Sequence, residues 1–215
     1  MPADPLDAPG GRRAFVPHRP VVIGLCGGVA AGKSAVASMF SAHGLLGVDA
    51  DAHARAAATE PAVLRAIVAR FGPAMVRDGA LDRAAMAQRV FADPGAKAEL
   101  EAIRHPRILA RIHAELAAAR AAGTSVLLDA PLLLETGLDA LCDRVVFVAA
   151  SDAVRLRRAA VRGWDAAELA RREAAQQPLA AKAARADHRI DNDGPPAATA
   201  RQVADLLDAL AAAPA

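Results

Sequence analysis

One short stretch decides the fold: residues 27–34 read GGVAAGKS and follow directly on the apolar run VVIGLC at residues 21–26. The apolar run is rich in β-branched residues and stops at glycine, a pattern typical of a buried parallel strand. The residues that follow the loop, 33–43, are predicted to form a helix. The stretch therefore matches G-x-x-x-x-G-K-[S/T] in full, in the strand–loop–helix context that the pattern requires.

This loop predicts a phosphate-binding site. Its glycines permit a tight turn, its backbone N–H groups form an anion-binding nest, and the helix that follows adds its dipole. Lys33 is predicted to place its charge on the β- and γ-phosphates of a nucleotide, and Ser34 to offer its hydroxyl to a Mg²⁺ ion that bridges phosphate oxygens. The predicted ATP-binding residues of the loop are Gly27, Gly28, Val29, Ala30, Ala31, Gly32, Lys33, Ser34 and Ala35.

The rest of the chain alternates between short apolar stretches and helical patterns. Further strands are predicted at residues 45–48, 125–129, 144–149 and 189–190. Helices are predicted within residues 52–122, 151–186 and 197–210. This alternation predicts an α/β fold with a five-stranded parallel sheet, flanked by helices and joined by right-handed crossovers.

Two of the helical segments are too long to be simple crossovers. The first, residues 52–122, is predicted to be a helical insert. Its breaks are expected at residues 60–61, 71–73, 93–95 and 105–106. The second, residues 151–186, is broken near Gly163 and Pro178. We expect a core of residues 20–51, 123–150 and 187–215 that forms a closing cleft with these inserts, preceded by a flexible tail of residues 1–19.

Composition excludes several classes of protein. Of the 215 residues, 54% are hydrophobic and 23% are charged, which argues against intrinsic disorder. The formal net charge of +2 is too small to indicate nucleic-acid binding. No apolar run reaches the roughly 18 residues of a membrane span, and the N-terminus lacks the apolar segment of a secretory signal. Cys26 and Cys142 lack the spacing of a metal or redox site, so they are predicted to be buried thiols in a reducing cytoplasm.

The phosphate loop alone does not separate kinases from switch GTPases and motor ATPases. A switch GTPase would carry an N-K-x-D segment, which the sequence lacks, and a D-x-x-G segment, whereas residues 129–132 read DAPL. The chain is therefore predicted to be a kinase of a small molecule. A regulatory or nucleic-acid-binding protein that used the arginines of residues 155–172 on phosphates is the alternative from another class. The small net charge and the 3% of aromatic residues argue against that alternative.

Several segments outside the loop carry a resemblance to a known family. They are VDAD at residues 48–51, IRHPRI at 103–108, DAPLLLETGL at 129–138, RRAAVR at 157–162 and AAQQPLAAKAARADHRIDNDG at 174–194. Together with GLCGGVAAGKS at 24–34, and in this order, they resemble the dephospho-CoA kinase family over all but the N-terminal tail. The chain departs from the family at Cys26 and Ala35, where Thr is common, and at Ala30 and Ala31, where Gly and Ser are common.

The resemblance implies a nucleoside-monophosphate-kinase-like fold, in which residues 52–122 bind the CoA precursor and residues 151–186 form a lid. The implied reaction transfers the γ-phosphate of ATP to the ribose 3′-hydroxyl of dephospho-CoA, the last step of coenzyme A synthesis. ATP and Mg²⁺ are the implied cofactors, and neither nucleic acid nor a membrane is an implied partner. A nucleoside or nucleotide kinase of the same fold is the alternative, because only the acceptor pocket would differ. The sequence leaves the oligomeric state open.

Asp51 follows the second predicted strand, at the carboxyl edge of the sheet where open α/β proteins bind ligands. The transfer needs a group that orients the acceptor hydroxyl and takes its proton, and the resemblance implies that Asp51 is this catalytic base. The alternative is a helix N-cap, a role that Asp49 fits better by position. Arg55, one helical turn after Asp51, either orients it, contacts the substrate's phosphates or forms a surface ion pair.

The resemblance also implies roles further along the chain. Arg158 is implied to be the lid arginine that stabilises the transferred charge once the lid closes, with Arg162 one turn later and facing the same way. His105 is implied to lie near the acceptor-binding surface, although the pair His105-Pro106 equally predicts the start of a helix. Glu135 is implied to be a carboxylate on the substrate side.

Three polar residues at the ends of predicted strands complete the candidate set. Asp129 ends the strand at residues 125–129 and is a candidate for acting on Mg²⁺ through a water molecule. Asp191 and Asn192 are expected to line the adenine pocket through backbone atoms, or alternatively to form an ordinary Asx turn.

Overall fold

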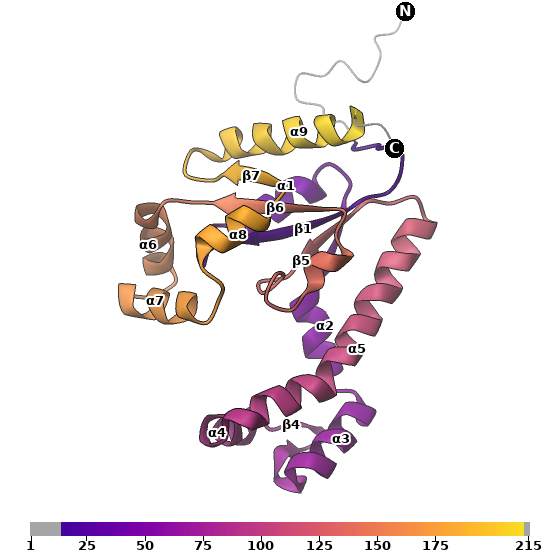
Figure 1. Cartoon of the computed structure of the whole chain (residues 1–215), viewed down its shortest axis with the longest axis vertical. Helices are drawn as coiled ribbons and strands as arrows, with labels where there is room; N and C mark the ends of the chain where they lie inside the picture. The colour runs from indigo at the N-terminus through magenta and orange to yellow at the C-terminus, as the bar shows by residue number, and fades with distance from the viewer. Residues whose placement is uncertain (1–13, 213–215) are drawn as a thin grey trace, which may run out of the picture. The chain divides into compact units, whose positions relative to one another are not determined.

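The computed structural model describes residues 14–212 and separates them into two compact units. The first unit comprises residues 14–48 and 118–212, and the second comprises Asp49–Ala117. The first unit is built on a five-stranded sheet in the order β2-β5-β1-β6-β7 (Figure 1). β1 pairs in parallel with β5 and β6, and β6 pairs in parallel with β7. The strands are β1 (Val22–Gly27), β2 (Leu46–Asp49), β5 (Val126–Asp129), β6 (Arg144–Ala149) and β7 (His188–Asp191).

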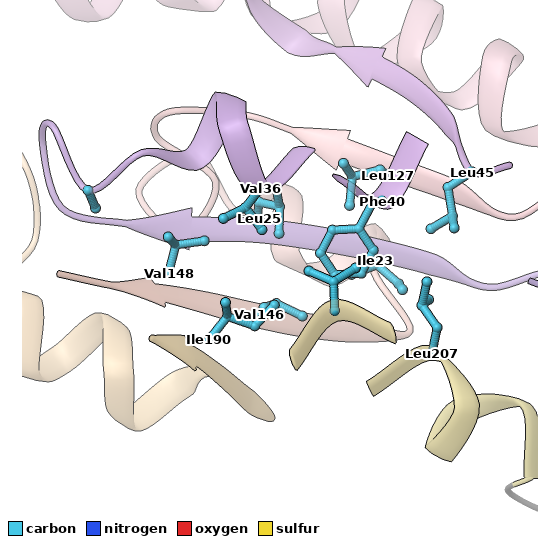
Figure 2. Packing of buried hydrophobic residues seen from close by; sticks show 12 residues of the cluster. Ile23, Leu25, Val36, Phe40, Leu45, Leu127, Val146, Val148, Ile190 and Leu207 are labelled. Atoms are coloured by element: carbon cyan, nitrogen blue, oxygen red, sulfur yellow. The ribbon is translucent and has the colours of Figure 1, made fainter. Parts of the chain in front are cut away.

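The apolar core of the first unit lies between the sheet and two helices, α1 (Lys33–Ser41) and α9 (Pro196–Ala212). Figure 2 shows Phe40 of α1 and Leu207 of α9 beside Ile23 of the central strand β1. Phe40 and Ile23 are completely buried, so this contact holds α1 firmly against the sheet. The loop that joins β1 to α1 is therefore supported at both of its ends.

The chain between β6 and β7 forms a group of short helices in the first unit. These are α6 (Asp152–Val161), α7 (Ala166–Ala174) and α8 (Leu179–Arg185). Trp164 and Leu169 pack with Val29 and Ala30 of the loop after β1, so this group has an apolar contact with the phosphate loop. A 3₁₀ turn, η2 (Leu138–Leu141), follows β5.

The second unit is helical apart from one small hairpin. Its elements are α2 (Ala50–Ala57), α3 (Pro61–Phe71), the 3₁₀ turn η1 (Pro73–Met75), β3 (Val76–Arg77), β4 (Ala80–Leu81), α4 (Arg83–Ala92) and α5 (Pro94–Ala121), which continues into the first unit. Val63, Ile67 and Met86 form a buried core of its own. The hairpin turns at Asp78 and Gly79, which have positive φ angles of 51° and 75°, as the favoured two-residue hairpin turns require.

The predicted fold class is confirmed, with element ends that differ by one or two residues. The helix expected at 33–43 ends at Ser41, and the strands expected at 45–48, 125–129 and 189–190 are Leu46–Asp49, Val126–Asp129 and His188–Asp191. The hairpin of β3 and β4 was not expected inside residues 52–122, because strands of two residues carry no alternation pattern. Over residues 14–212, no helix has the length and apolarity that crossing a membrane demands.

The predicted break at residues 105–106 is wrong, because both residues lie inside α5. Pro106 donates no backbone N–H and its ring crowds the preceding turn, so local propensity favours a helix end there. Contacts with other elements hold the helix on both sides of Pro106. Arg104 donates to a carbonyl of α2 at 3.1 Å, and Arg111 pairs with Glu60 at 2.7 Å. Tertiary contacts therefore override the local preference.

The N-terminal prediction concerns residues 1–19, of which residues 1–13 lie outside the described residues. Within the described part, the N–H of Phe15 donates to the carbonyl of His43 at 2.9 Å, and the Phe15 side chain packs against the core of the first unit. Arg19 forms an ion pair with Asp143 at 3.2 Å. The contacts of the first unit therefore begin before β1.

Candidate active site

The loop between β1 and α1 takes a backbone shape that requires glycine at two positions. Gly27 has a φ of 152°, and a Cβ there would lie 2.6 Å from the carbonyl oxygen of Val148. Gly32 has a φ of 92°, and a Cβ there would collide with Nδ2 of Asn192. Gly32 is also the N-cap of α1, which no side chain caps. The N–H groups of Lys33 and Ser34 are therefore left for a ligand or water, whereas those of Ala35 and Val36 donate to the carbonyl of Gly32.

Ala30 adopts a left-handed backbone conformation without being a glycine, with a φ of 60°. A left-handed conformation costs an alanine about 1–2 kcal/mol relative to the right-handed one. The Ala30 side chain is buried and packs with Ala159 and Leu169, which offsets part of that cost. The loop thus keeps its shape with alanine at a position whose backbone conformation favours glycine.

Lys33 is the first residue of α1 and is partly buried. Burial lowers the pKa of the Lys33 ammonium below its usual value, and the nearby carboxylate of Asp129 opposes this effect. The positive charge of Lys182 lowers the pKa further, whereas Glu135 raises it. The structure therefore brings Lys33 within electrostatic reach of Asp129 and Glu135, two carboxylates from the end of β5 and the loop after it.

Two side chains from distant segments reach the loop backbone at a single point. Nη1 of Arg158 and Nδ2 of Asn192 both donate to the carbonyl oxygen of Ala31, each at 2.8 Å. Nη2 of Arg158 donates to the carbonyl of Asn192 at 2.7 Å. Asp191 instead accepts the N–H of Asp193 at 2.9 Å, which is the Asx turn named as its alternative. The structure thus joins three of the candidate nucleotide-binding residues.

Arg162 contacts different partners from Arg158. The helix α6 ends at Val161, and Arg162 follows it as an exposed C-cap residue. Its guanidinium lies 5.5 Å from the centre of the Trp164 ring, and that of Arg172 lies 4.0 Å from the same centre. Arg158 therefore stabilises the loop by hydrogen bonds, whereas the guanidinium groups of Arg162 and Arg172 both contact the Trp164 ring.

Glu135 is engaged with the end of the helical group between β6 and β7. Its Oε1 accepts from Nζ of Lys182 and from the N–H of Gln177, each at 2.8 Å. Nζ of Lys182 also donates to Gln176 at 2.8 Å, and the Lys182 side chain is only 1% exposed. Burial by itself raises the pKa of Glu135, but the hydrogen bonds from Lys182 and Gln177 outweigh it and lower the pKa below its usual value. Glu135 is therefore an ionised partner of a buried lysine.

In the second unit, Asp49 and not Asp51 caps α2. Oδ1 of Asp49 accepts the N–H of Ala52 at 3.0 Å, and its Oδ2 pairs with Arg55 at 3.2 Å. Both partners of this ion pair are more than half exposed, so Arg55 makes the surface ion pair that the sequence left open, with Asp49 as its partner. Asp51 is exposed in the first turn of the helix.

Asp51 lies on the wall of a cavity of about 490 Å³ within the second unit. Three arginines share this wall, namely Arg55, Arg83 and Arg104. Arg104 donates to the carbonyl of Ala54, while its buried Nε has no hydrogen-bond partner among the described residues. The rest of the lining is apolar and consists of Ala54, Ala58, Leu81, Met86, Ala87, Val90 and Leu100. His105 is not part of this lining.

The sequence analysis missed three of these residues. Arg83 and Arg104 stand among many other arginines, so nothing in the sequence marks them as cavity residues. Lys182 did carry a signal: the chain has 26 lysines and arginines, yet lysine occurs only at positions 33, 97 and 182. A lysine kept in a chain that otherwise prefers arginine indicates a position where the compact ammonium matters.

The fold and the loop together define a class of protein. A complete phosphate loop follows the central strand of a parallel sheet, and an arginine from the helices after β6 reaches the backbone of that loop. This is the architecture of a P-loop kinase.

Comparisons with known proteins identify the family within this class. The family model for dephospho-CoA kinase matches residues 21–197. The dephospho-CoA kinase of Anaeromyxobacter dehalogenans is 48% identical over 190 residues, which cover 86% of this chain and 90% of the relative. That of Deinococcus radiodurans is 44% identical over 181 residues, which cover 83% and 87%. The chain therefore belongs to the dephospho-CoA kinase family, as the resemblance predicts.

Solved structures agree with this fold. The crystal structure of TT1252 from Thermus thermophilus matches with a TM-score of 0.75 and 34% identity, covering 89% of this chain and 98% of that one. The structure of a dephospho-CoA kinase from Campylobacter jejuni matches with a TM-score of 0.69 and 21% identity, covering 88% and 96%. At that lower identity the second match shows the shared fold.

Proposed function

We propose that this chain phosphorylates the ribose 3′-hydroxyl of dephospho-CoA with ATP as the donor, giving coenzyme A, and that its two units divide the work. The observation that carries the proposal is the complete phosphate loop in a chain of the dephospho-CoA kinase family. The first unit holds ATP. The second unit, with the cavity beside Asp51, holds the acceptor.

The donor side consists of the loop and the start of α1. Backbone N–H groups of residues 28–34, apart from that of Ala31, which donates to Gly28, hold the phosphates, and Lys33 places its charge on the β- and γ-phosphates. Ser34 is exposed at the first turn of α1, where its hydroxyl is free to face a metal bound to those phosphates. Mg²⁺ bound there neutralises charge on the phosphate oxygens. Ser34 and the phosphate oxygens would hold this ion, and Asp129, whose charge lies near Lys33, remains the candidate for acting on it through a water molecule.

The arginines after β6 complete the donor side. Arg158 supports the loop through Ala31 and donates to the carbonyl of Asn192, and the turn of Asp191 and Asn192 is the proposed neighbour of adenine. A guanidinium at this place stabilises charge that develops on the transferred phosphoryl group. Arg162, exposed beside Trp164, is the second cation assigned to this task.

The acceptor side consists of Asp51 and the cavity of the second unit. Asp51 is not used as a helix cap, so its carboxylate is available to orient the 3′-hydroxyl and accept its proton. Dephospho-CoA carries a diphosphate and a long arm in which methyl and methylene groups alternate with two amides. The cavity offers three arginines against one aspartate, with an apolar wall that includes Met86 and Leu100. Its charge and polarity therefore suit such a ligand.

His105 and Glu135 remain predictions for the acceptor side. His105 lies on α5, and Glu135 is ionised beside Lys182. Their contribution to acceptor binding is best judged by the Michaelis constant for the acceptor in single variants.

The experiment that tests the proposal compares acceptors. The purified chain is supplied with ATP and Mg²⁺, and either dephospho-CoA or a nucleoside monophosphate such as AMP or CMP, and product is measured by mass spectrometry. We expect phosphate transfer to dephospho-CoA, and kcat/KM for the monophosphates lower by several orders of magnitude. Transfer to a monophosphate at a comparable rate would support the alternative, a nucleotide kinase of the same fold.

A further inference from the structure

Thr199 places a hydroxyl in the apolar interior of the first unit. It lies on α9 at four and eight residues before Val203 and Leu207, so it shares the face of the helix that these core residues present to the sheet. Thr199 is 1% exposed. A buried hydroxyl at a core position needs a hydrogen-bond partner to offset its desolvation.

The partner of this hydroxyl is the turn that follows β7. Oγ1 of Thr199 lies 3.1 Å from Oδ1 of Asn192 and 3.4 Å from the carbonyl oxygen of Asp191. The shorter of these is the contact with the Asn192 side chain. Asn192 is itself buried, with 5% exposure, and its N–H donates to the carbonyl of Ala149 at 2.8 Å. Both the backbone and the side chain of Asn192 are therefore held in place.

The hydroxyl of Thr199 and the carbonyl of Ala31 together set which end of the Asn192 amide faces the phosphate loop. Because Oδ1 accepts from Thr199, Nδ2 points the other way and donates to the carbonyl of Ala31. A flipped amide would set two oxygens against each other at Ala31, and Thr199, which would then accept from the amide NH₂, would have only the longer contact with the Asp191 carbonyl for its own proton. Arg158 also donates to that Ala31 oxygen, so both of its lone pairs are used.

The direction of the Ala31 carbonyl also sets the direction of the Gly32 N–H, because both groups belong to the same peptide bond. A trans peptide is planar, and its C=O and N–H groups point in opposite directions. When the Ala31 carbonyl is held against Asn192 and Arg158, the N–H of Gly32 is turned to the opposite side of the loop. Gly32 caps α1 in the left-handed conformation, and its N–H belongs to the set that forms the phosphate nest.

We propose that Thr199 is a positioning residue for ATP binding, which acts through the Asn192 amide on the Ala31–Gly32 peptide of the phosphate loop. The proposal rests on the function proposed above, since it assumes that the loop binds ATP. Thr199 touches no part of the loop itself in this arrangement. Its effect reaches the loop by one hydrogen bond to Asn192 and one from Asn192 to Ala31.

The first test compares two variants of Thr199 on the full chain. Thr199→Val keeps the shape and removes the hydroxyl, whereas Thr199→Ser keeps the hydroxyl. We expect Thr199→Val to raise the ATP dissociation constant, measured by calorimetry, and KM for ATP by about three- to tenfold, as for the loss of one buried hydrogen bond. KM for dephospho-CoA should change less than twofold, and Thr199→Ser should stay within twofold of the wild type throughout.

Val203→Ala is the matched control, because it removes buried volume from the same face of α9 without touching Asn192. It should lower the melting temperature and leave ATP affinity unchanged. The proposal is wrong, and Thr199 is an ordinary core residue, if Thr199→Val lowers the melting temperature but leaves ATP affinity unchanged, as expected for Val203→Ala. It is also wrong if the ATP affinity of Thr199→Ser is as weak as that of Thr199→Val. Thr199→Ala repeats the comparison should the valine variant not fold.

The second test is a double-mutant cycle with Asn192→Ala. Because Thr199 acts through Asn192, adding Thr199→Val to Asn192→Ala should weaken ATP binding no further. Additive losses would show a separate route and would overturn the proposal. Calorimetry measures ATP binding without an acceptor, so the proposed function and the role of Thr199 can be tested separately. A wild type that binds ATP but does not phosphorylate dephospho-CoA contradicts only the proposed function. A wild type active on dephospho-CoA, with unchanged ATP affinity in Thr199→Val, contradicts only the role of Thr199.

Discussion

At the scale of single residues, two aspartates two positions apart in the sequence have separate tasks. Asp49 uses both carboxylate oxygens within the protein, one on the N–H of Ala52 and one on Arg55. Asp51 stands exposed on the wall of the arginine-lined cavity. The pair therefore offers a natural comparison, because the same chemical change has a structural consequence at one position and a proposed catalytic consequence at the other.

We expect Asp51→Asn to lower kcat by roughly 10²–10⁴-fold, the usual scale for loss of a general base, while ATP affinity is retained. Asparagine keeps the shape of the side chain but accepts no proton. Asp49→Asn is the matched control, since asparagine caps helices as well as aspartate does, and it should keep most of the activity. Turnover would be measured with saturating ATP and dephospho-CoA, and ATP affinity by calorimetry. Intact turnover together with lost ATP binding in Asp51→Asn would make Asp51 a nucleotide or metal ligand instead.

Lys33 supplies the second prediction at this scale. We expect Lys33→Ala to lower kcat/KM by at least about 100-fold, since it removes the cation that stabilises charge on the phosphates. The fold should survive, because the variant removes a partly buried charge and no apolar contact. Lys97→Ala is the control. Lys97 is 70% exposed and lies 3.9 Å from Glu101, so its replacement should leave kcat/KM unchanged. Near wild-type turnover in Lys33→Ala would contradict the assignment of the phosphate loop.

At the scale of elements, a buried ion pair ties the start of α8 to the loop after β5. Glu135 accepts from both Lys182 and the N–H of Gln177, while Lys182 is almost completely buried. Taking one partner from such a pair leaves an uncompensated charge in the interior. Glu135 is therefore one of two carboxylates that hold α8, since Asp139 also pairs with Arg185.

We expect Glu135→Gln to reduce the free energy of unfolding by about 3 kcal/mol at pH 7. Glu101→Gln, which breaks only the exposed pair with Lys97, should change it by less than about 0.5 kcal/mol. The pKa of Glu135 is lowered in the folded state, so its stabilisation is present above the ordinary value of 4.5 and is lost as pH falls through the lowered pKa. The difference between wild type and Glu135→Gln, measured by denaturant titration, should therefore shrink below about pH 4.5. A difference that stays constant down to pH 3 would contradict this account.

At the scale of the whole molecule, the residues proposed for donor and acceptor fall in different units. The phosphate loop, Arg158 and Asn192 belong to the first unit, and Asp51 with the arginine-lined cavity belongs to the second. Each unit has an apolar core of its own. Each ligand should therefore stabilise its own unit when it binds alone.

Hydrogen exchange with one ligand at a time tests this division. ATP alone should slow exchange in residues 28–36 and 191–193, and dephospho-CoA alone should slow it in residues 50–58 and 83–104. The reason is that a bound ligand stabilises the local structure that contacts it, by an amount that grows with its concentration over Kd. Protection by dephospho-CoA confined to the first unit would show that the cavity is not the acceptor site.

The phosphate loop and the order of elements could be predicted from the sequence because they depend on neighbours. Glycine positions, the strand before them and the helix after them are all set by backbone preferences within a few residues. The predicted break at residues 105–106 followed the same local logic and was wrong. There, hydrogen bonds of Arg104 and Arg111 to distant segments keep α5 continuous through Pro106.

By itself, the sequence determined the class of fold, the phosphate loop and the family. Only the tertiary structure decided which groups meet. Asn192 and Arg158 both contact Ala31, although 161 and 127 positions separate them from it in the sequence. These contacts exist because β6 lies between β1 and β7 in the sheet, so the residues after β6 and β7 come to the same carboxyl edge as the loop after β1. Glu135 is held by Lys182 for the same reason, whereas Arg55 and Asp49 pair within one helix and its cap. Local preferences act over one turn of chain, whereas burial and hydrogen bonding pair residues by their distance in space.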